Sequence, residues 1–218
     1  MIIAIDGPAA SGKSTTAKLV AKKLKMTYLD TGAMYRAVTL ALLRSNTNLD
    51  DYDSIFQVVS ELELDIYDQG TKTVVRLDGE DVSQAIRSML ETENVSAVSA
   101  VKYVREAMVE IQRNIGKKTN CVVEGRDIGT VVFPDAEFKI FMVADDKMRA
   151  ERRLKELHLM GENRSLQEVM TNLKKRDQKD STRSHSPLLK ADEAIEIDTS
   201  MLSIDQQVEK IINLVRKK

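Results

Sequence analysis

The eight residues Gly7-Pro8-Ala9-Ala10-Ser11-Gly12-Lys13-Ser14 lie near the N-terminus, between an apolar run and a helix-forming segment. Their pattern, Gly-x4-Gly-Lys-Ser, is that of the Walker A phosphate-binding loop. In such a loop, backbone N–H groups surround phosphate oxygens at the positive end of the following helix, which is predicted here over residues 13 to about 25. The strand-like run at residues 2–5 completes the expected context. An ordinary glycine-rich turn is the alternative, and pattern and context together disfavour it.

The motif also predicts part of the chemistry. Lys13 can reach the β- and γ-phosphates of a nucleoside triphosphate, and the Ser14 hydroxyl can ligate Mg²⁺. We name Ser14 as the only protein ligand of the ion, because water and phosphate oxygens complete most Mg²⁺ shells at such sites. The pattern alone does not separate a kinase from an ATPase or a switch protein. A GTPase is disfavoured, since the chain has no Asn-Lys-x-Asp run for reading guanine.

The composition excludes several classes of protein. The chain has 218 residues, 42% of them hydrophobic and 31% charged, which suits one α/β domain with a small insertion. A formal net charge of −1 argues against a nucleic-acid-binding protein, and the absence of Trp argues against a base-stacking surface. The single cysteine, Cys121, is interpreted as a core thiol. It permits no internal disulfide, and the first apolar run stops at Asp6, too short for a signal peptide or membrane span. We therefore expect a cytoplasmic protein, and a monomer because no heptad seam stands out.

Five short apolar runs predict the strands of one central sheet. They are residues 2–5, 27–29, 121–123, 138–143 and 194–197. Helical patterns separate them, and the last helix begins at Ser203 with Gln206 three residues later, which is a capping signal. This alternation is typical of a parallel sheet covered by helices on both faces. We therefore predict an α/β, P-loop NTPase-type fold of three layers around a parallel five-stranded sheet.

One stretch interrupts this order. Residues 62–67 and 73–77 alternate apolar and polar side chains around Asp68-Gln69-Gly70, which predicts a β-hairpin, and a second turn is expected at Asp78-Gly79. The chain is accordingly divided into three parts: a core (1–35, 111–146 and 184–218), an inserted lobe (36–110) and a short helical lid (147–183).

Positive charge concentrates in the lid, which holds eleven Lys/Arg and six Asp/Glu. Two sets of its side chains share a helix face by their spacing: Arg149, Arg152 and Arg153, and then Arg176, Asp180 and Arg183. Ser165 with Glu168 predicts a capping box at the start of the second lid helix. A solvated helix face is the plain interpretation of such charge. The phosphate loop elsewhere in the chain favours a lid that faces phosphates, where fixed cations stabilise phosphoryl transfer.

Two further polar segments each follow a predicted strand. Asp30-Thr31-Gly32-Ala33-Met34-Tyr35-Arg36 follows the second strand, and Glu124-Gly125-Arg126-Asp127-Ile128-Gly129-Thr130 follows the third. Parallel strands bring their carboxyl ends to one edge, where α/β sheets bind ligands. With the lid, this edge offers cations for an acceptor phosphate (Arg36, Arg126 and Arg176) and carboxylates for hydroxyl or amine donors (Asp127 and Asp180). A single Arg-Asp pair is more often a local ion pair, so their coincidence at one edge is the stronger signal.

These segments together resemble those of the bacterial cytidylate kinases, and the likeness covers nearly the whole chain. Four segments carry it: residues 5–14, residues 29–36, Gly125-Arg126-Asp127-Ile128-Gly129-Thr130-Val131-Val132-Phe133-Pro134, and Arg176-Asp177-x-x-Asp180-x-x-Arg183. The resemblance implies transfer of the ATP γ-phosphate to CMP or dCMP with Mg²⁺. It also implies that the inserted lobe binds the monophosphate.

The resemblance and the charge pattern give three sets of candidate residues. The ATP-binding set is Gly7, Pro8, Ala9, Ala10, Ser11, Gly12, Lys13, Ser14 and Thr15. The CMP-binding set is Asp30, Thr31, Arg36, Ser96, Arg105, Arg126, Asp127, Arg176, Asp180 and Arg183. The catalytic set is Lys13, Arg126, Arg149, Arg153 and Arg176.

Within the acceptor set, the resemblance implies that Ser96, Arg105 and Asp127 read the cytosine. A carboxylate can accept from the exocyclic amine, while Arg and Ser donate to N3 and O2; uracil carries a carbonyl in place of the amine. Ser96 and Arg105 are nine residues apart, which places them on opposite faces of a straight helix. For both to reach one base, the helix must break near residues 99–102.

Two other functions stay open at this point. One is a kinase for another small acceptor, such as UMP or a sugar-like acid. The other is a regulatory module that binds ATP without transferring phosphate. We expect the lid and the lobe to close over bound substrates and to exclude water.

Overall fold

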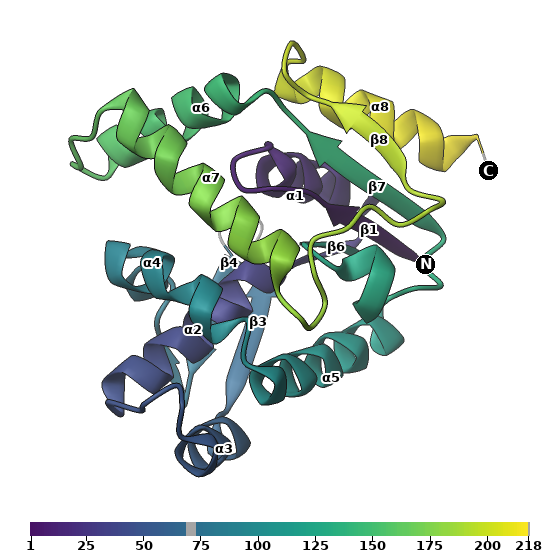
Figure 1. Cartoon of the computed structure of the whole chain (residues 1–218). Helices are drawn as coiled ribbons and strands as arrows, with labels where there is room; N and C mark the ends of the chain where they lie inside the picture. The colour runs from purple at the N-terminus through teal and green to yellow at the C-terminus, as the bar shows by residue number, and fades with distance from the viewer. Residues whose placement is uncertain (69–72, 218) are drawn as a thin grey trace.

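The core of the molecule is a parallel five-stranded sheet, seen in a computed structural model that describes residues 1–68 and 73–217. Its strands, in spatial order, are β2 (Thr27–Asp30), β6 (Cys121–Gly125), β1 (Ile2–Asp6), β7 (Phe138–Val143) and β8 (Ile195–Asp198). All five predicted strands are confirmed, and β6 extends two residues further than its apolar run. The strands β6, β1, β7 and β8 are labelled in Figure 1. β1 and β6 are buried almost throughout, which explains why they read as unbroken apolar runs.

Helices cover both faces of this sheet. On one face, α1 (Lys13–Leu24) and α8 (Ile204–Arg216) enclose an apolar cluster with β1 and β7. On the other face, α2 (Thr31–Arg44) and α5 (Lys102–Lys118) pack with β2 and β6 around a second cluster that includes Cys121. The three-layer α/β prediction is therefore confirmed, and Cys121 is a fully buried core thiol as expected.

The predicted helix signals are also confirmed. Ser203 and Gln206 form a capping box before α8, and Ser165 and Glu168 form another before α7 (Leu166–Thr182). α7 pairs with α6 (Asp146–Leu159) as a helical hairpin. No helix in the part of the chain that the structure describes is both long and apolar enough to cross a bilayer.

The predicted insertion contains a second, antiparallel sheet. Its strands are β3 (Leu64–Asp68), β4 (Thr73–Leu77) and β5 (Glu80–Asp81). β3 begins two residues later than expected. Asp78 and Gly79 form the predicted second turn, and both have positive φ, 51° and 81°, as a type I′ turn requires. The expected turn residues Gln69 and Gly70 lie outside the described residues.

The remaining insertion elements are helical. They are α3 (Tyr52–Glu61), a 3₁₀ turn (Ala85–Arg87) and α4 (Met89–Val98). α4 ends at Val98 and α5 begins at Lys102, so the predicted helix break between Ser96 and Arg105 is confirmed.

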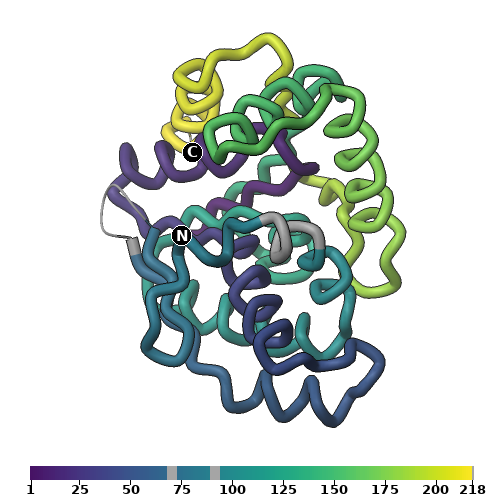
Figure 2. The backbone as a smooth tube through the Cα atoms, turned by 90° about the vertical axis from the view of Figure 1, so that its left-hand side faces the viewer, coloured from purple at the N-terminus to yellow at the C-terminus, as the bar shows by residue number. Residues whose placement is uncertain are grey.

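Seen from the side, the insertion gathers at the end of the molecule opposite α8, and α7 runs along one flank between the two (Figure 2). α4 and α7 are in contact. The boundaries expected after residues 35 and 110 fall inside α2 and α5, so two continuous helices join the sheet to the insertion. The division into core, lobe and lid stays a prediction.

Candidate active site

The loop after β1 has the backbone shape of a phosphate cradle. Gly7 has φ 152°, and a Cβ there would lie 2.2 Å from the backbone oxygen of Met142 on the neighbouring strand. Gly12 has φ 93° and is the N-cap of α1. Glycine is therefore required at the start of the loop by a close approach, and it is favoured at the end by the left-handed backbone. The first N–H groups of α1 remain available to an anion at the positive end of the helix.

Lys13 is buried and its ammonium folds back over this loop. Its Nζ donates to the backbone oxygen of Pro8 at 3.1 Å. Burial and the nearby cation of Arg126 lower the pKa of Lys13 to about 7, and Glu124 only partly offsets them. The loop therefore holds a cation that a bound phosphate would stabilise.

A hydrogen-bonded trio next to Lys13 joins the first turn of α1 to β2 and β6. The Ser14 hydroxyl donates to Glu124 Oε2 at 2.7 Å, and the Tyr28 hydroxyl donates to Glu124 Oε1. Burial and the neighbouring carboxylate of Asp30 raise the pKa of Glu124. These oxygen donors fit Mg²⁺, a hard cation that prefers carboxylate, hydroxyl, phosphate and water oxygens. Among residues 1–68 and 73–217, no three or more His, Cys, Asp or Glu are grouped to hold a metal ion.

The segment after β6 places Asp127 in a buried ionic cluster. Arg105 Nη2 donates to Asp127 Oδ2, and Arg183 Nη2 lies 3.8 Å from Oδ1. Arg105 also donates to the backbone oxygen of Ser99 at 3.0 Å, in the break between α4 and α5. Its guanidinium lies 5.2 Å from the ring centre of Tyr35. The helix break therefore directs Arg105 toward Asp127, and Arg183 at the end of α7 meets the same carboxylate after β6.

A second ion pair adjoins this cluster. Arg126 Nε donates to Asp180 Oδ2 at 2.9 Å, which joins the sheet edge to α7. Burial opposes the ionisation of Asp180, but Arg126 and Arg176 hold its pKa below the usual range. Burial and the Arg126 cation also lower the pKa of Arg176 to about 10, and its Nε has no hydrogen-bond partner among the described residues. Arg126 and Arg176 also lie close enough to Lys13 to lower its pKa, so three cations gather between the phosphate loop and α7.

The residues that follow β2 are tied into the same edge. Asp30 caps α2 by accepting from the Ala33 N–H at 2.8 Å, and Arg36 lies 3.4 Å from the Asp30 carboxylate. The Thr31 hydroxyl donates to the backbone oxygen of Glu124 at 2.7 Å. Asp30, Thr31 and Arg36 therefore lie together at the end of β2, and Thr31 joins them to β6.

The lid arginines divide into two groups rather than acting together. Arg149 pairs with Asp177 and donates to the backbone oxygen of Ala9 at 3.2 Å. Arg152 donates to the backbone oxygen of Ser11 at 3.3 Å and to that of Thr199 at 2.6 Å. These two hold the phosphate loop through its backbone.

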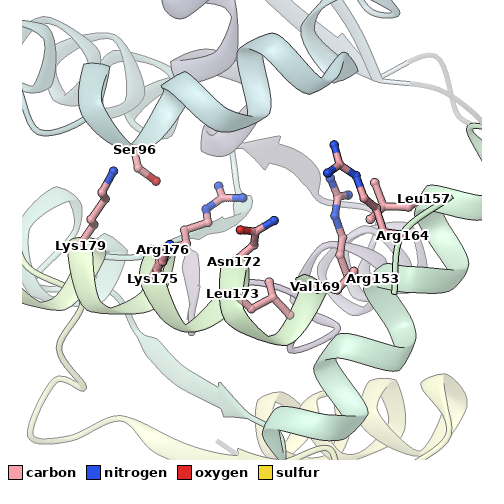
Figure 3. Close-up of a pocket in the computed structure, with 10 residues that line it drawn as sticks. All are labelled: Ser96, Arg153, Leu157, Arg164, Val169, Asn172, Leu173, Lys175, Arg176 and Lys179. Atoms are coloured by element: carbon pink, nitrogen blue, oxygen red, sulfur yellow. The ribbon is translucent and has the colours of Figure 1, made fainter. Parts of the chain in front are cut away.

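Arg153 instead lines a cavity of about 240 Å³ between α4 and the hairpin of α6 and α7. Ser96 lies on the opposite side, facing α7 (Figure 3). The other lining residues are Leu157, Arg164, Val169, Asn172, Leu173, Lys175, Arg176 and Lys179. Of the ten described residues that line the cavity, five are Lys or Arg and none is Asp or Glu. The cavity therefore favours an anionic group.

The comparisons with known proteins agree with this geometry. The cytidylate kinase family model matches residues 3–217. This chain belongs to the cytidylate kinase family. It is 50% identical over 218 residues to the cytidylate kinase of Fusobacterium nucleatum, covering 100% of this chain and 96% of the relative. It is 44% identical over 215 residues to that of Clostridioides difficile strain 630, covering 99% and 98%. The family confirms the predicted enzyme class, a kinase.

Solved structures of low sequence identity support the fold alone. An uncharacterised protein from Eubacterium ventriosum matches with a TM-score of 0.55 at 14% identity, covering 100% of this chain and 99% of the other. A shikimate kinase from Bacteroides thetaiotaomicron matches with a TM-score of 0.50 at 12% identity, covering 99% and 98%.

In this cytidylate kinase family member, the predicted residues do not all converge at one point. Arg105, Asp127 and Arg183 meet directly, while Ser96 faces the cationic cavity with Arg176. The sequence placed Arg152 only on a shared lid face and Asp177 only in a motif, and it assigned no role to three further residues of the site: Asp6, Tyr28 and Glu124. Of these, only Glu124 could have been singled out from the sequence, because a carboxylate near the end of a buried strand requires a partner.

Proposed function

We propose that this kinase transfers the γ-phosphate of ATP to CMP or dCMP and releases ADP and the nucleoside diphosphate. The observation that carries the proposal is the buried Asp127 carboxylate, held by Arg105 and Arg183 at the sheet edge that also bears the phosphate loop. The membership of the cytidylate kinase family supports the acceptor.

The donor half of the site is the loop from Gly7 to Thr15. Its backbone N–H groups and Lys13 bind the ATP phosphates. Burial lowers the pKa of Lys13, and the negative phosphates raise it again and so favour the charged ammonium. Ser14 would ligate Mg²⁺ bound with ATP, and the ion would supply positive charge that neutralises the phosphates. Arg149 keeps the loop in place through Ala9, and Arg153 adds positive charge to the cavity beside α6 and α7.

The acceptor half reads the base and holds the monophosphate. Asp127 accepts from the cytosine amine, and Arg105, whose guanidinium already contacts Asp127, donates to a ring acceptor. Ser96 supplies a further hydroxyl from α4. Asp180 and Arg183 bind the sugar. Three arginines and one hydroxyl surround the acceptor phosphate: Arg36 and Thr31 on α2 beside Asp30, Arg126 after β6, and Arg176 on α7.

The transfer requires no strong base. An oxygen of the CMP phosphate attacks the γ-phosphorus, the bond to the β,γ-bridging oxygen breaks, and ADP leaves with that oxygen. Charge develops on the transferred group and the leaving oxygen, where Lys13, Arg126 and Arg176 stabilise it. Positioning and electrostatics therefore supply the catalysis.

We also propose that the protein acts as a monomer in the cytoplasm. The single, fully buried cysteine suits a reducing compartment. Light scattering during gel filtration checks the mass, and a dimer of 24.5 kDa chains would contradict the proposal.

The test of the acceptor is ADP release with CMP, dCMP, UMP, AMP and GMP, and with ATP alone. We expect CMP and dCMP to exceed UMP by about a hundredfold or more, because a wrong base leaves buried polar groups unpaired. Asp127→Asn should abolish most of this preference, while Asp51→Asn, at the exposed cap of α3, should retain it. Equal rates with UMP and CMP in the unmodified protein would exclude cytosine reading. ADP release with ATP alone as fast as with CMP would exclude acceptor-dependent closure.

A further inference from the structure

A buried carboxylate at the end of β1 has no role in the chemistry described above. Asp6 is 5% exposed and immediately precedes the phosphate loop. Its two oxygens each accept a backbone N–H from the acceptor-binding segment: Oδ1 from Ile128 at 2.8 Å and Oδ2 from Gly129 at 2.7 Å. These bonds join residues more than 120 positions apart, so Asp6 links the donor loop to the segment that bears Asp127.

The two N–H groups belong to the first residues of a π-helical turn, Ile128–Val132. Asp127 occupies the N-cap position of that turn, where an Asp side chain ordinarily accepts the N–H of the second or third residue, here Gly129 or Thr130. Within the described part of the chain, Asp127 makes no such bond, because its carboxylate faces Arg105 and Arg183. The cap is supplied by Asp6 from the neighbouring strand.

We propose that Asp6 is a positioning residue for the acceptor site: by capping the turn in place of Asp127, it leaves the Asp127 carboxylate free to face Arg105 and the acceptor base. The inference rests on the proposed function for its catalytic consequence and on geometry alone for the capping. In Asp6→Asn, one oxygen becomes an NH₂ group that opposes a backbone N–H. The side chain at the N-cap, Asp127, can then supply the missing acceptor only by leaving Arg105.

The kinetic test separates this role from a merely structural one. In Asp6→Asn, kcat/KM for CMP should fall about tenfold or more, since a hydrogen bond to a charged group is lost, and the preference for CMP over UMP should fall with it. In the Asp127→Asn background the same substitution should add less than about threefold, because the carboxylate through which Asp6 acts is gone. Asp51→Asn, which makes the same change at the cap of α3, is the matched control and should leave the preference intact.

Two outcomes would overturn the proposal: an unchanged CMP-over-UMP preference in Asp6→Asn, or a loss that is equally large with and without Asp127. A wild-type protein that does not prefer CMP over UMP would refute the proposed function instead. The capping of the turn by Asp6 would then be tested by the NMR titration described next.

That measurement uses the unmodified, ligand-free protein, so it also serves if Asp6→Asn does not fold. Burial raises the pKa of Asp6 to about 6, and the charged groups that act on it are Asp127 and Lys13. In an NMR titration from pH 4.5 to 8, the amide protons of Ile128 and Gly129 should shift together, with the same midpoint as the Asp6 carboxyl carbon. Amide shifts that do not follow the Asp6 carboxyl would refute the capping.

Discussion

The protonation of Lys13 should be linked to nucleotide binding. Its pKa lies at about 7 in the ligand-free protein, against 10.5 for an ordinary lysine, because the ammonium is buried and faces the Arg126 cation. At pH 8, about nine in ten molecules should therefore carry a neutral Lys13. Phosphates beside Nζ favour the charged form, so ATP binding at pH 8 should take up about 0.9 proton.

The same linkage sets the affinity. Between pH 6 and pH 8 the fraction of protein with a charged Lys13 falls by about tenfold, so the Kd for nucleotide should rise by about tenfold, or about 1.4 kcal/mol. The stability of the ligand-free protein runs the other way. Because the folded pKa lies below the unfolded one, Lys13 contributes stability that grows as pH rises from about 7 toward 10.5 and is lost as pH falls through 7.

The assay is isothermal titration calorimetry with a non-hydrolysable ATP analogue and Mg²⁺, in phosphate-free buffers of low and high ionisation enthalpy. The difference between buffers gives the protons taken up at each pH. Lys13→Arg is the control, because a guanidinium stays charged and should abolish the uptake. Uptake below about 0.2 proton at pH 8, or the same uptake in Lys13→Arg, would refute the assignment of a depressed pKa to this lysine.

Three further substitutions test other contacts of the site. Tyr28→Phe removes a donor to the buried Glu124 carboxylate and should lower the free energy of unfolding by about 1.5–3 kcal/mol, with a higher Mg²⁺ requirement; an unchanged melting curve would contradict it. Gly7→Ala should abolish nucleotide binding by calorimetry in a folded protein, because the added Cβ meets the Met142 backbone oxygen at 2.2 Å; retained affinity would show that the loop adapts. Arg152→Ala should raise KM for ATP about tenfold and leave KM for CMP within about twofold, because its bonds hold the phosphate loop; equal effects on both would indicate general destabilisation.

The strands of the sheet could be predicted from the sequence because their burial shows in consecutive residues of each strand. Strands buried on both faces must be apolar along their whole length, so runs such as residues 121–123 stand out without any partner being known. The phosphate loop was equally predictable, because its backbone requires glycine: a Cβ at Gly7 would clash with Met142, and Gly12 has a left-handed backbone. The helix break between α4 and α5 followed from spacing alone.

The contacts that assemble the site could not be predicted in this way. Arg149, Arg152 and Arg153 share one helix face by spacing, yet the first two hold the loop backbone and the third lines a cavity. Spacing places side chains on a face but says nothing about which backbone oxygens another segment presents to it. Asp6 was similarly hidden, because its partners lie more than 120 residues away.

Both carboxylates of the proposed acceptor site are already paired in the ligand-free protein. Asp127 pairs with Arg105, and Asp180 pairs with Arg126, all at low exposure. Under the proposed acceptor assignment, the base must displace the Asp127–Arg105 pair, and a base with an amine donor and ring acceptors can replace both partners of that pair. A base that satisfies one partner leaves the other buried without a hydrogen bond, which costs more than the lost contact alone. Selectivity in this site should thus come mainly from the penalty on wrong bases.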